Sequence, residues 1–180
     1  MSKYPLYTRG SMRAKAISAG SITVPSIVLP GVTLSTTIAP VVTEMRTLTE
    51  TTGAGVYTAS ITVPAAALIL DIKLWSTVLW TATTSALADI GDVADPDGWF
   101  TQVNCKATDL LVGEEINFIQ TGGKEGAYLV LATGARTKAY AATARVVSCI
   151  LTTVGAAGNA GRSFFAVQYV LPTTTAATKV

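Results

Sequence analysis

Alternating apolar and polar residues recur through most of the chain after residue 50 and predict a series of β-strands. Six stretches are rich in β-branched or aromatic residues, as half-buried strands are. They are Val56–Val63, Leu68–Leu79, Glu115–Gln120, Gly126–Ala132, Ala142–Thr153 and Ser163–Leu171. Turn-forming residues separate several of them, at Pro64–Ala66, Asp92–Gly98, Gly122–Lys124 and Gly155–Gly161. With no helical patterns between the strands, the sequence predicts a mainly β protein with an antiparallel β-sandwich or jelly-roll-like domain.

The first fifty residues have a different pattern, with many small residues and hydroxyl side chains. Four prolines interrupt this segment, at Pro5, Pro25, Pro30 and Pro40. Because proline restricts itself and the preceding residue to extended conformations, residues 1–50 predict an extended N-terminal arm. Short strands are expected in it at Ser21–Val24 and Val32–Ile38. Such an arm has little core of its own and gains order by lying on a neighbouring surface.

One segment of the arm, Val42–Thr51, is the single helix candidate of the chain, although it is rich in Thr and only weakly periodic. The residues after Pro172 are polar and Thr-rich, which predicts a flexible tail. The expected organisation is therefore an arm over 1–50, a sandwich over 51–172 and a tail over 173–180.

The strand predicted at Leu68–Leu79 carries two different faces. Alternation places Ile69, Asp71, Lys73 and Trp75 on one face and Leu70, Ile72, Leu74 and Ser76 on the other. Trp75 and Trp80 have opposite parity if the strand is unbroken, so they cannot both face one core. Either one of them lies at an interface, or a bulge or loop near Leu79 removes the conflict.

The amino-acid composition predicts that this protein binds other protein surfaces. Only 13% of the residues are charged while 49% are hydrophobic, so a monomer would leave much apolar surface in water. A net charge of +2 is too small for a nucleic-acid-binding protein, and no run of eighteen apolar residues predicts a membrane span. The N-terminus lacks the apolar run of a secretory signal, so we expect synthesis and retention in a cytoplasm.

Catalytic chemistry that depends on imidazole is excluded because the chain contains no histidine. Cys105 and Cys149 are far apart in sequence and match no metal or redox spacing, so we expect buried thiols.

The densest acidic feature holds Asp89, Asp92, Asp95 and Asp97 within nine residues. Carboxylates on a glycine-containing loop can gather around Ca²⁺. The spacing lacks a bidentate Glu, however, and Pro96 breaks the alternation of an EF-hand loop. We therefore favour a pair of turns in which Asp side chains accept hydrogen bonds from local backbone amides, with Asp97 and Gly98 closing a bend.

A carboxylate pair for glycoside hydrolysis is conceivable among Asp109, Glu114 and Glu115, but no aromatic-lined cleft is indicated in this aromatic-poor chain. Gly122 and Gly123 are followed by neither the spacing nor the Ser or Thr of a phosphate loop, so they predict a turn. The sequence therefore predicts no enzyme, no catalytic or metal site and no cofactor.

Four basic residues of the second half could form a weak basic patch, at Arg136, Lys138, Arg145 and Arg162. Scattered surface charges are the favoured interpretation. Rim charges of this kind affect encounter and register more than affinity.

Four segments within residues 53–172 resemble a family of small tailed-bacteriophage virion proteins. They are VPAAALILDIKLWSTVLW, IGDVADPDGWF, GGKEGAYLVLATGARTKAY and GRSFFAVQYVLP. The family's acidic loop is matched at Gly91, Asp92, Asp95, Asp97 and Gly98. The resemblance implies a structural role in the virion, without distinguishing capsid decoration from a tail or fibre part.

The leading hypothesis is a capsid cement or decoration protein on the outer surface of a virion. We expect it to bind the major capsid protein and to self-associate as a homotrimer, with the arm reaching onto capsid subunits. A tail, fibre or adaptor component is the alternative.

Overall fold

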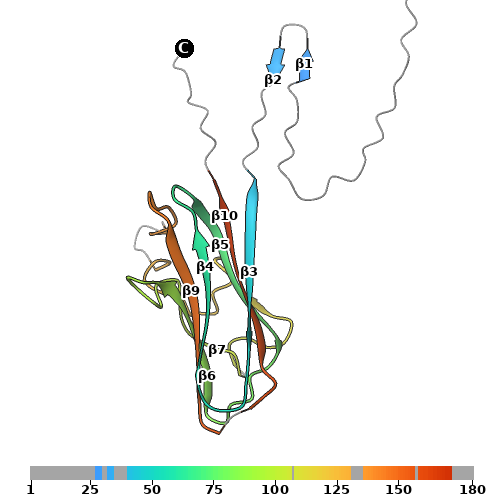
Figure 1. Cartoon of the computed structure of the whole chain (residues 1–180), viewed down its shortest axis with the longest axis vertical. Helices are drawn as coiled ribbons and strands as arrows, with labels where there is room; N and C mark the ends of the chain where they lie inside the picture. The colour runs from blue at the N-terminus through green and yellow to red at the C-terminus, as the bar shows by residue number, and fades with distance from the viewer. Residues whose placement is uncertain are drawn as a thin grey trace, which may run out of the picture. The chain divides into compact units, whose positions relative to one another are not determined.

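Figure 1 shows the computed structural model, which describes residues 27–29, 32–34, 40–106, 108–130, 136–156 and 158–171. Every regular element in these ranges is a strand, so the described chain is all-β. Among the described residues there is accordingly no helix of the length and apolar character needed to span a membrane. The predicted tail over 173–180 lies outside the described residues.

The chain divides into two compact units, which are described separately. The first comprises residues 1–37, where β1 (Ile27–Leu29) pairs antiparallel with β2 (Val32–Leu34). β2 lies within the strand predicted at Val32–Ile38, whereas Ser21–Val24 falls outside the described residues. The second unit comprises residues 38–180 and holds the other eight strands.

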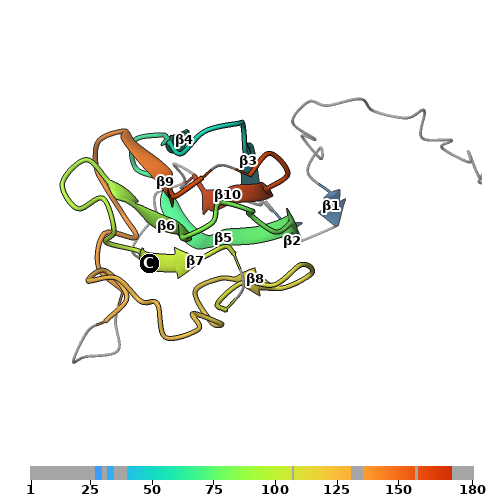
Figure 2. The same cartoon turned by 90° about the horizontal axis from the view of Figure 1, so that it is seen from below.

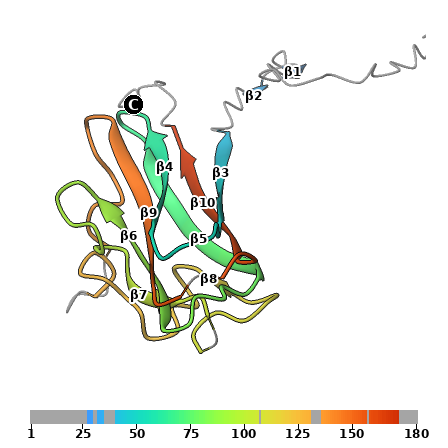
Figure 3. The ribbon, with the colours of Figure 1, turned by 60° about the horizontal axis from the view of Figure 1, so that its bottom comes forward.

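Two four-stranded antiparallel sheets make up the second unit (Figure 3). The first sheet has the order β3 (Val41–Thr49), β10 (Arg162–Val170), β5 (Leu68–Val78) and β8 (Glu115–Ile116). The second sheet has the order β4 (Val56–Val63), β9 (Arg145–Val154), β6 (Ser85–Asp92) and β7 (Phe100–Asn104). One hydrophobic cluster contains buried residues of both sheets. The predicted antiparallel β-sandwich is confirmed.

The strands pair in a nested order that local sequence patterns do not reveal. β6 pairs with β7, β5 with β8, β4 with β9 and β3 with β10, from the middle of the unit outward along the chain. This is the order of a long antiparallel hairpin folded over into the two layers of the sandwich. β3 and β4, the first two strands of this unit, contact each other at one side of the sandwich (Figure 2).

The core forms because each strand sends alternate side chains between the sheets. In β4 the buried residues are Ala59, Ile61 and Val63, whereas Thr58, Ser60 and Thr62 between them are exposed. The largest fully buried side chains are aromatic: Trp80, Trp99, Phe100 and Phe165. Both cysteines are free and buried, as predicted. Burial raises the pKa of Cys105 to about 12, so this thiol stays neutral.

The helix predicted at Val42–Thr51 is wrong, because this segment forms β3. β3 pairs with β10 without a register shift, from Val41 opposite Val170 to Thr49 opposite Arg162. Its β-branched residues suit a strand, and the pairing with β10 decides the conformation where the local pattern is weak. Residues 41–49 therefore lie in the sheet rather than in the arm.

The other strand predictions vary in accuracy. Four of the six predicted stretches correspond to β4, β5, β9 and β10, with β4 matching at both ends. The strand predicted at Glu115–Gln120 shortens to the two residues of β8. The strand predicted at Gly126–Ala132 is wrong over 126–130, where the backbone turns and the Leu129 and Val130 N–H groups donate to the Gly126 carbonyl. β6 and β7 were not predicted.

An irregularity in β5 changes the predicted faces of this strand. Gln168 of β10 lies opposite Asp71, but the next residue, Tyr169, lies opposite Ile69, so Leu70 is an extra residue in β5. Such a bulge reverses the alternation. Ile69 therefore joins Ile72 in the core, and the prediction that Ile69 shares a face with Asp71 is wrong.

The two tryptophans of opposite parity do have different environments. β5 ends at Val78, so Trp80 belongs to the following loop and is free to turn inward. Trp80 is buried, and its Nε1 donates to the Ser163 hydroxyl at 2.8 Å. Trp75 stays on the outer face of the sheet and is partly exposed. The loop after Val78 removes the conflict, as one of the two alternatives predicted.

Candidate interaction surface

The outer face of the β3–β10–β5 part of the first sheet carries the largest group of exposed apolar side chains on one described face. The members on β5 and β10 point away from the core because their neighbours along each strand are buried, and those on β3 lie in register with the same outer side of β10. They are Val41 and Met45 of β3, Phe164 and Val170 of β10, and Leu68 and Trp75 of β5. We call this set the apolar face. Met45 is 50% exposed and Val41 59% exposed, so water reaches the face.

An aromatic pair lies at the centre of the apolar face. Trp75 and Phe164 are register partners on β5 and β10, and their rings stack at 5.4 Å between centroids with 16° between planes. Ala166, two residues further along β10, lies between Met45 and Lys73 of the flanking strands and is buried although it faces outward. The stack is rigid because cross-strand pairing fixes both side chains.

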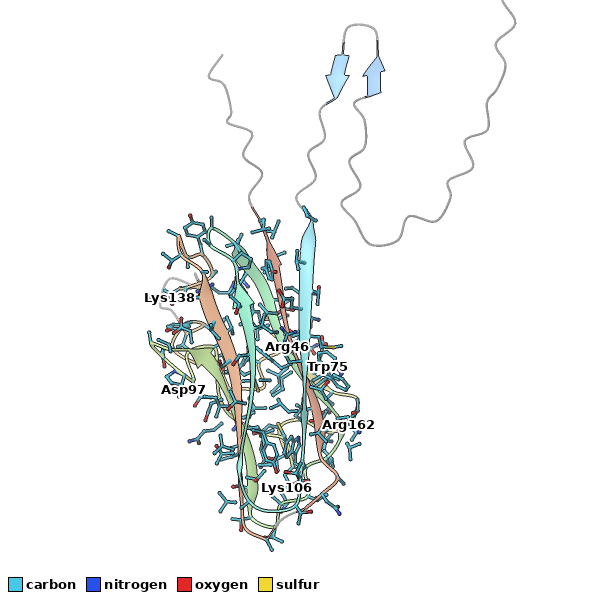
Figure 4. All side chains as sticks on the ribbon, in the orientation of Figure 1. Arg46, Trp75, Asp97, Lys106, Lys138 and Arg162 are labelled. Carbon is cyan, nitrogen blue, oxygen red and sulfur yellow. The ribbon has the colours of Figure 1, made fainter. Side chains whose placement is uncertain are left out.

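The charges beside the apolar face neutralise one another. Lys73 Nζ lies 3.2 Å from Glu115 and 3.7 Å from Asp71. Hydrogen bonds from Asn117 and Lys73 hold the pKa of Glu115 below its usual value, so this carboxylate stays ionised. Arg162 lies at the far end of the same face, two residues before Phe164 (Figure 4). The face therefore carries two cations and two anions.

The outer face of the second sheet has a different chemistry. Its β4 residues are Thr58, Ser60 and Thr62, which carry hydroxyl groups. The Ser60 and Ser148 hydroxyls bond each other across β4 and β9 at 2.9 Å. Exposed apolar residues on this face, such as Val56, have no aromatic stack beside them among the described residues. We call this set of residues the hydroxyl face.

The acidic segment is a structural turn in which Asp92 and Asp97 accept local hydrogen bonds, while the neighbouring Asp97 carboxylate raises the pKa of Asp95. Asp92 accepts hydrogen bonds from the Ala94 N–H at 2.9 Å and the Asp95 N–H at 3.1 Å, as the turn interpretation predicts. The Tyr128 hydroxyl donates to the same Asp92 oxygen at 3.1 Å. Asp97 accepts from the Thr101 hydroxyl at 3.1 Å.

Asp89 has a separate role at an irregularity between β6 and β7. The register of this pair shifts between Ala88 and Ile90, and the Asp89 carboxylate accepts the Gln102 N–H at 2.7 Å. Asp89 thus replaces a missing backbone acceptor. Within the described ranges, no three acidic or cysteine side chains gather as metal ligands would.

The acidic turn is pressed against the rest of the protein at two glycines. A Cβ at Gly91 would overlap the backbone of Asp95 and Pro96, and one at Gly126 would overlap the backbone of Asp97. Only glycine permits this approach. The turn is therefore held by the 126–130 segment as well as by its own hydrogen bonds.

The three carboxylates considered for hydrolysis are not arranged as a facing pair. Asp109 lies 3.0 Å from Lys124 and accepts the Asn104 N–H at 2.8 Å. Glu114 accepts the Leu111 N–H at 2.9 Å, within its own turn. Glu115 is engaged by Lys73 at the apolar face. Each carboxylate thus stabilises a different local structure.

The four basic residues lie in different environments, in agreement with scattered charges. Figure 4 shows Lys138 and Arg162 at opposite sides of the sandwich. Arg136 donates to the Leu70 carbonyl at 2.8 Å and covers the Phe118 ring. Arg145 is half-buried over the Trp99 ring, and this burial lowers its pKa although Asp92 opposes the shift.

A shallow groove of about 470 Å³ lies beside Arg145 and the acidic turn. Its lining includes Thr62, Asp92, Val93 and Val146. Val93 is 99% exposed, so the groove offers an apolar rim to a partner.

Sequence reasoning missed one buried charge, Glu50, which follows β3. Its Oε2 accepts from the Thr81 N–H at 2.9 Å, the Thr81 hydroxyl at 2.8 Å and the Gly161 N–H at 2.9 Å, and its Oε1 accepts from the Ala82 N–H at 3.0 Å. Burial acts to raise the pKa of Glu50, but these hydrogen bonds outweigh it and lower the pKa. Glu50 therefore joins three loops at one end of the sandwich.

No protein-family model matches the chain. No curated protein matches it either. Two solved structures contain similar chains. One belongs to the capsid asymmetric unit of cyanophage Pam1, with 17% identity and a TM-score of 0.46 over 86% of this chain and 99% of that chain. The other belongs to the acidic stable capsid of Helicobacter pylori bacteriophage KHP30, with 17% identity and a TM-score of 0.47 over 76% of this chain and 95% of that chain.

Proposed function

We propose that the chain is a non-enzymatic structural protein of a phage virion, a capsid cement or decoration protein that binds the major capsid protein on the outer shell. The single observation that carries the proposal is a sandwich with apolar side chains exposed on both outer faces, from Met45 on one to Val56 on the other. A protein with 13% charged residues gains from covering such surfaces. The resemblance of residues 53–172 to virion proteins supports this role.

The physical account is multivalent contact. A homotrimer of this chain presents three sandwiches and three N-terminal segments to the shell at once, so each further contact forms at a high effective concentration. A protein that binds assembled shells and not free subunits stabilises the assembled state by mass action. No reaction is needed, and the described carboxylates already serve local structure.

The test uses purified full-length protein and capsids that lack it. Bound copies are counted by gel densitometry, and their positions are determined by cryo-electron microscopy. Saturable binding at symmetry-related shell positions is the expected result. A Val93→Asp variant tests the rim of the groove beside Arg145, and Thr52→Asp, exposed in the loop between β3 and β4, is its control.

A tail, fibre or adaptor component is the second candidate, because the same apolar surface suits any virion assembly. It predicts that shells bind no protein while antibodies locate the chain at the tail of intact particles. This outcome would replace the cement proposal.

A further inference from the structure

We infer that the apolar face binds a second copy of this chain. This inference rests on the self-association within the proposed function and names the surface through which it takes place.

The centre of the apolar face is a stacked pair of aromatic side chains. The Trp75–Phe164 stack is fixed by strand pairing, and Met45 lies on the neighbouring edge strand, 50% exposed. Aromatic residues and Met are enriched at protein interfaces, and rigid aromatic anchors near the centre carry most of the binding energy. Because the two rings already pack on each other, less conformational freedom is lost when a partner covers them.

The two outer faces of the sandwich differ in their side-chain chemistry. The central residues of the hydroxyl face carry groups that water solvates well, and Ser60 and Ser148 already bond each other. Serine is depleted at interfaces relative to other surface. Both outer faces carry exposed Thr and aliphatic side chains, but the face of Val41, Met45 and Leu68 adds the Trp75–Phe164 stack to them. Of the two faces, the apolar face gains more when it is covered.

The charges of the apolar face favour a second copy of this chain as its partner. Lys73 is already paired with Asp71 and Glu115, so the face has no free charged cluster that calls for an oppositely charged partner. A typical soluble domain has about 25% charged residues, and a partner of that kind would bury unpaired charges here at a large cost. This chain is 13% charged, so a second copy offers a surface that avoids the cost.

The edge of the sheet extends the same contact. Within the described sheet, β3 is paired on one side only, with β10. The far side of β3 therefore presents backbone N–H and C=O groups to a neighbour. Met45 and Val41 stand on this edge strand, so a copy that covers them also reaches the edge.

The experiment measures the oligomeric state of the full-length protein by sedimentation velocity over a range of concentrations. The variant is Met45→Glu, with Val56→Glu as matched control: both replace an exposed apolar residue of an edge strand, on opposite sheets. We expect the wild type and the control to self-associate alike, and Met45→Glu to weaken association by at least about tenfold. Val41→Glu is the second variant, and thermal melting verifies that each is folded.

A monomeric wild type, or equal association of the wild type and both face variants, overturns the inference. If the wild type is monomeric and the Met45→Glu variant no longer binds shells, the apolar face contacts the shell protein. The inference is then wrong as well. The two proposals fail separately: shells that bind nothing contradict the cement role, while association lost in Met45→Glu still supports the contact between copies.

Discussion

At the scale of single residues, the buried carboxylate of Glu50 connects the loops at one end of the sandwich. It is 3% exposed and accepts four hydrogen bonds from the loops before β6 and before β10. In Glu50→Gln an amide N–H₂ takes the place of one acceptor and faces N–H donors. Since hydrogen bonds to charged groups contribute about 1.5–3 kcal/mol each, we expect the free energy of unfolding to fall by about 2 kcal/mol or more.

Urea unfolding measures this loss. Glu114→Gln is the control, because Glu114 is exposed and accepts one local N–H. Exposed substitutions of this type stay within about 0.5 kcal/mol. Equal stability of the two variants would contradict the role assigned to Glu50.

The same carboxylate sets the response of stability to acid. The pKa of Glu50 is lowered in the folded protein, so the folded state binds its proton less readily than the unfolded state does. Its contribution is complete above the ordinary pKa of about 4.3 and is lost as the pH falls through the lowered pKa of the folded state. Asp109 and Glu115 have lowered pKa values as well and act in the same direction.

We therefore expect stability to decrease as the pH falls below about 4.3, with little change between pH 6 and 8, because the chain has no histidine. Unfolding curves at a series of pH values test this. Glu50→Gln should show a smaller loss in acid than the wild type. A wild-type stability that rises in acid would show that the sign is wrong.

At the scale of elements, β3 marks where the folded sandwich begins. Neither four-stranded sheet contains a described strand that precedes Val41, so a chain beginning at Ile38 keeps every pairing of the sandwich. A chain beginning at Thr51 lacks β3, the buried Leu48 and Glu50. Loss of one buried Leu side chain alone costs about 2–5 kcal/mol. We expect the first chain to melt within a few degrees of the full-length protein and the second to be unfolded or strongly destabilised, as circular dichroism would show.

The strands that the sequence predicts well are those in which alternation and β-branched residues agree, as in β4. β3 was missed because its pattern is weak and its conformation depends on β10, which lies more than a hundred residues away in the chain. β6 was missed because its small side chains, such as Ala86 and Ala88, and its two Asp residues resemble a loop. The opposite error occurred around Tyr128, where a strand was predicted. Tyr128 packs on Trp99, but it lies in a turn.

The candidate surface was partly predictable for the same reason. Alternation placed Lys73 and Trp75 on one face of β5 and raised the possibility of a contact there. Phe164 as the stacking partner depends on the register of β5 and β10, which no local pattern contains. The bulge at Leu70, which moves Ile69 inward, is equally a product of strand pairing.

At the scale of the whole molecule, the low charge decides what kind of partner binds. The net charge is +2, and the described ion pairs at the apolar face compensate one another. Association through such a surface removes apolar area from water and releases few counterions. Its strength should therefore vary little with sodium chloride and increase in sulfate, which strengthens apolar burial.

The measurement is the binding of the full-length protein to shells over a range of salt concentrations. A protein held by six to ten phosphate contacts loses affinity by about 10³–10⁵ between about 50 and 200 mM salt. For this chain we expect a change of no more than a few fold, because Lys73 at the apolar face is paired with carboxylates and Arg136, Arg145 and Arg162 lie in different environments. A steep loss of binding with salt would mean that charged contacts hold the protein on the shell. In that case Arg162 and the other scattered cations, not the apolar residues, would be the groups to replace first.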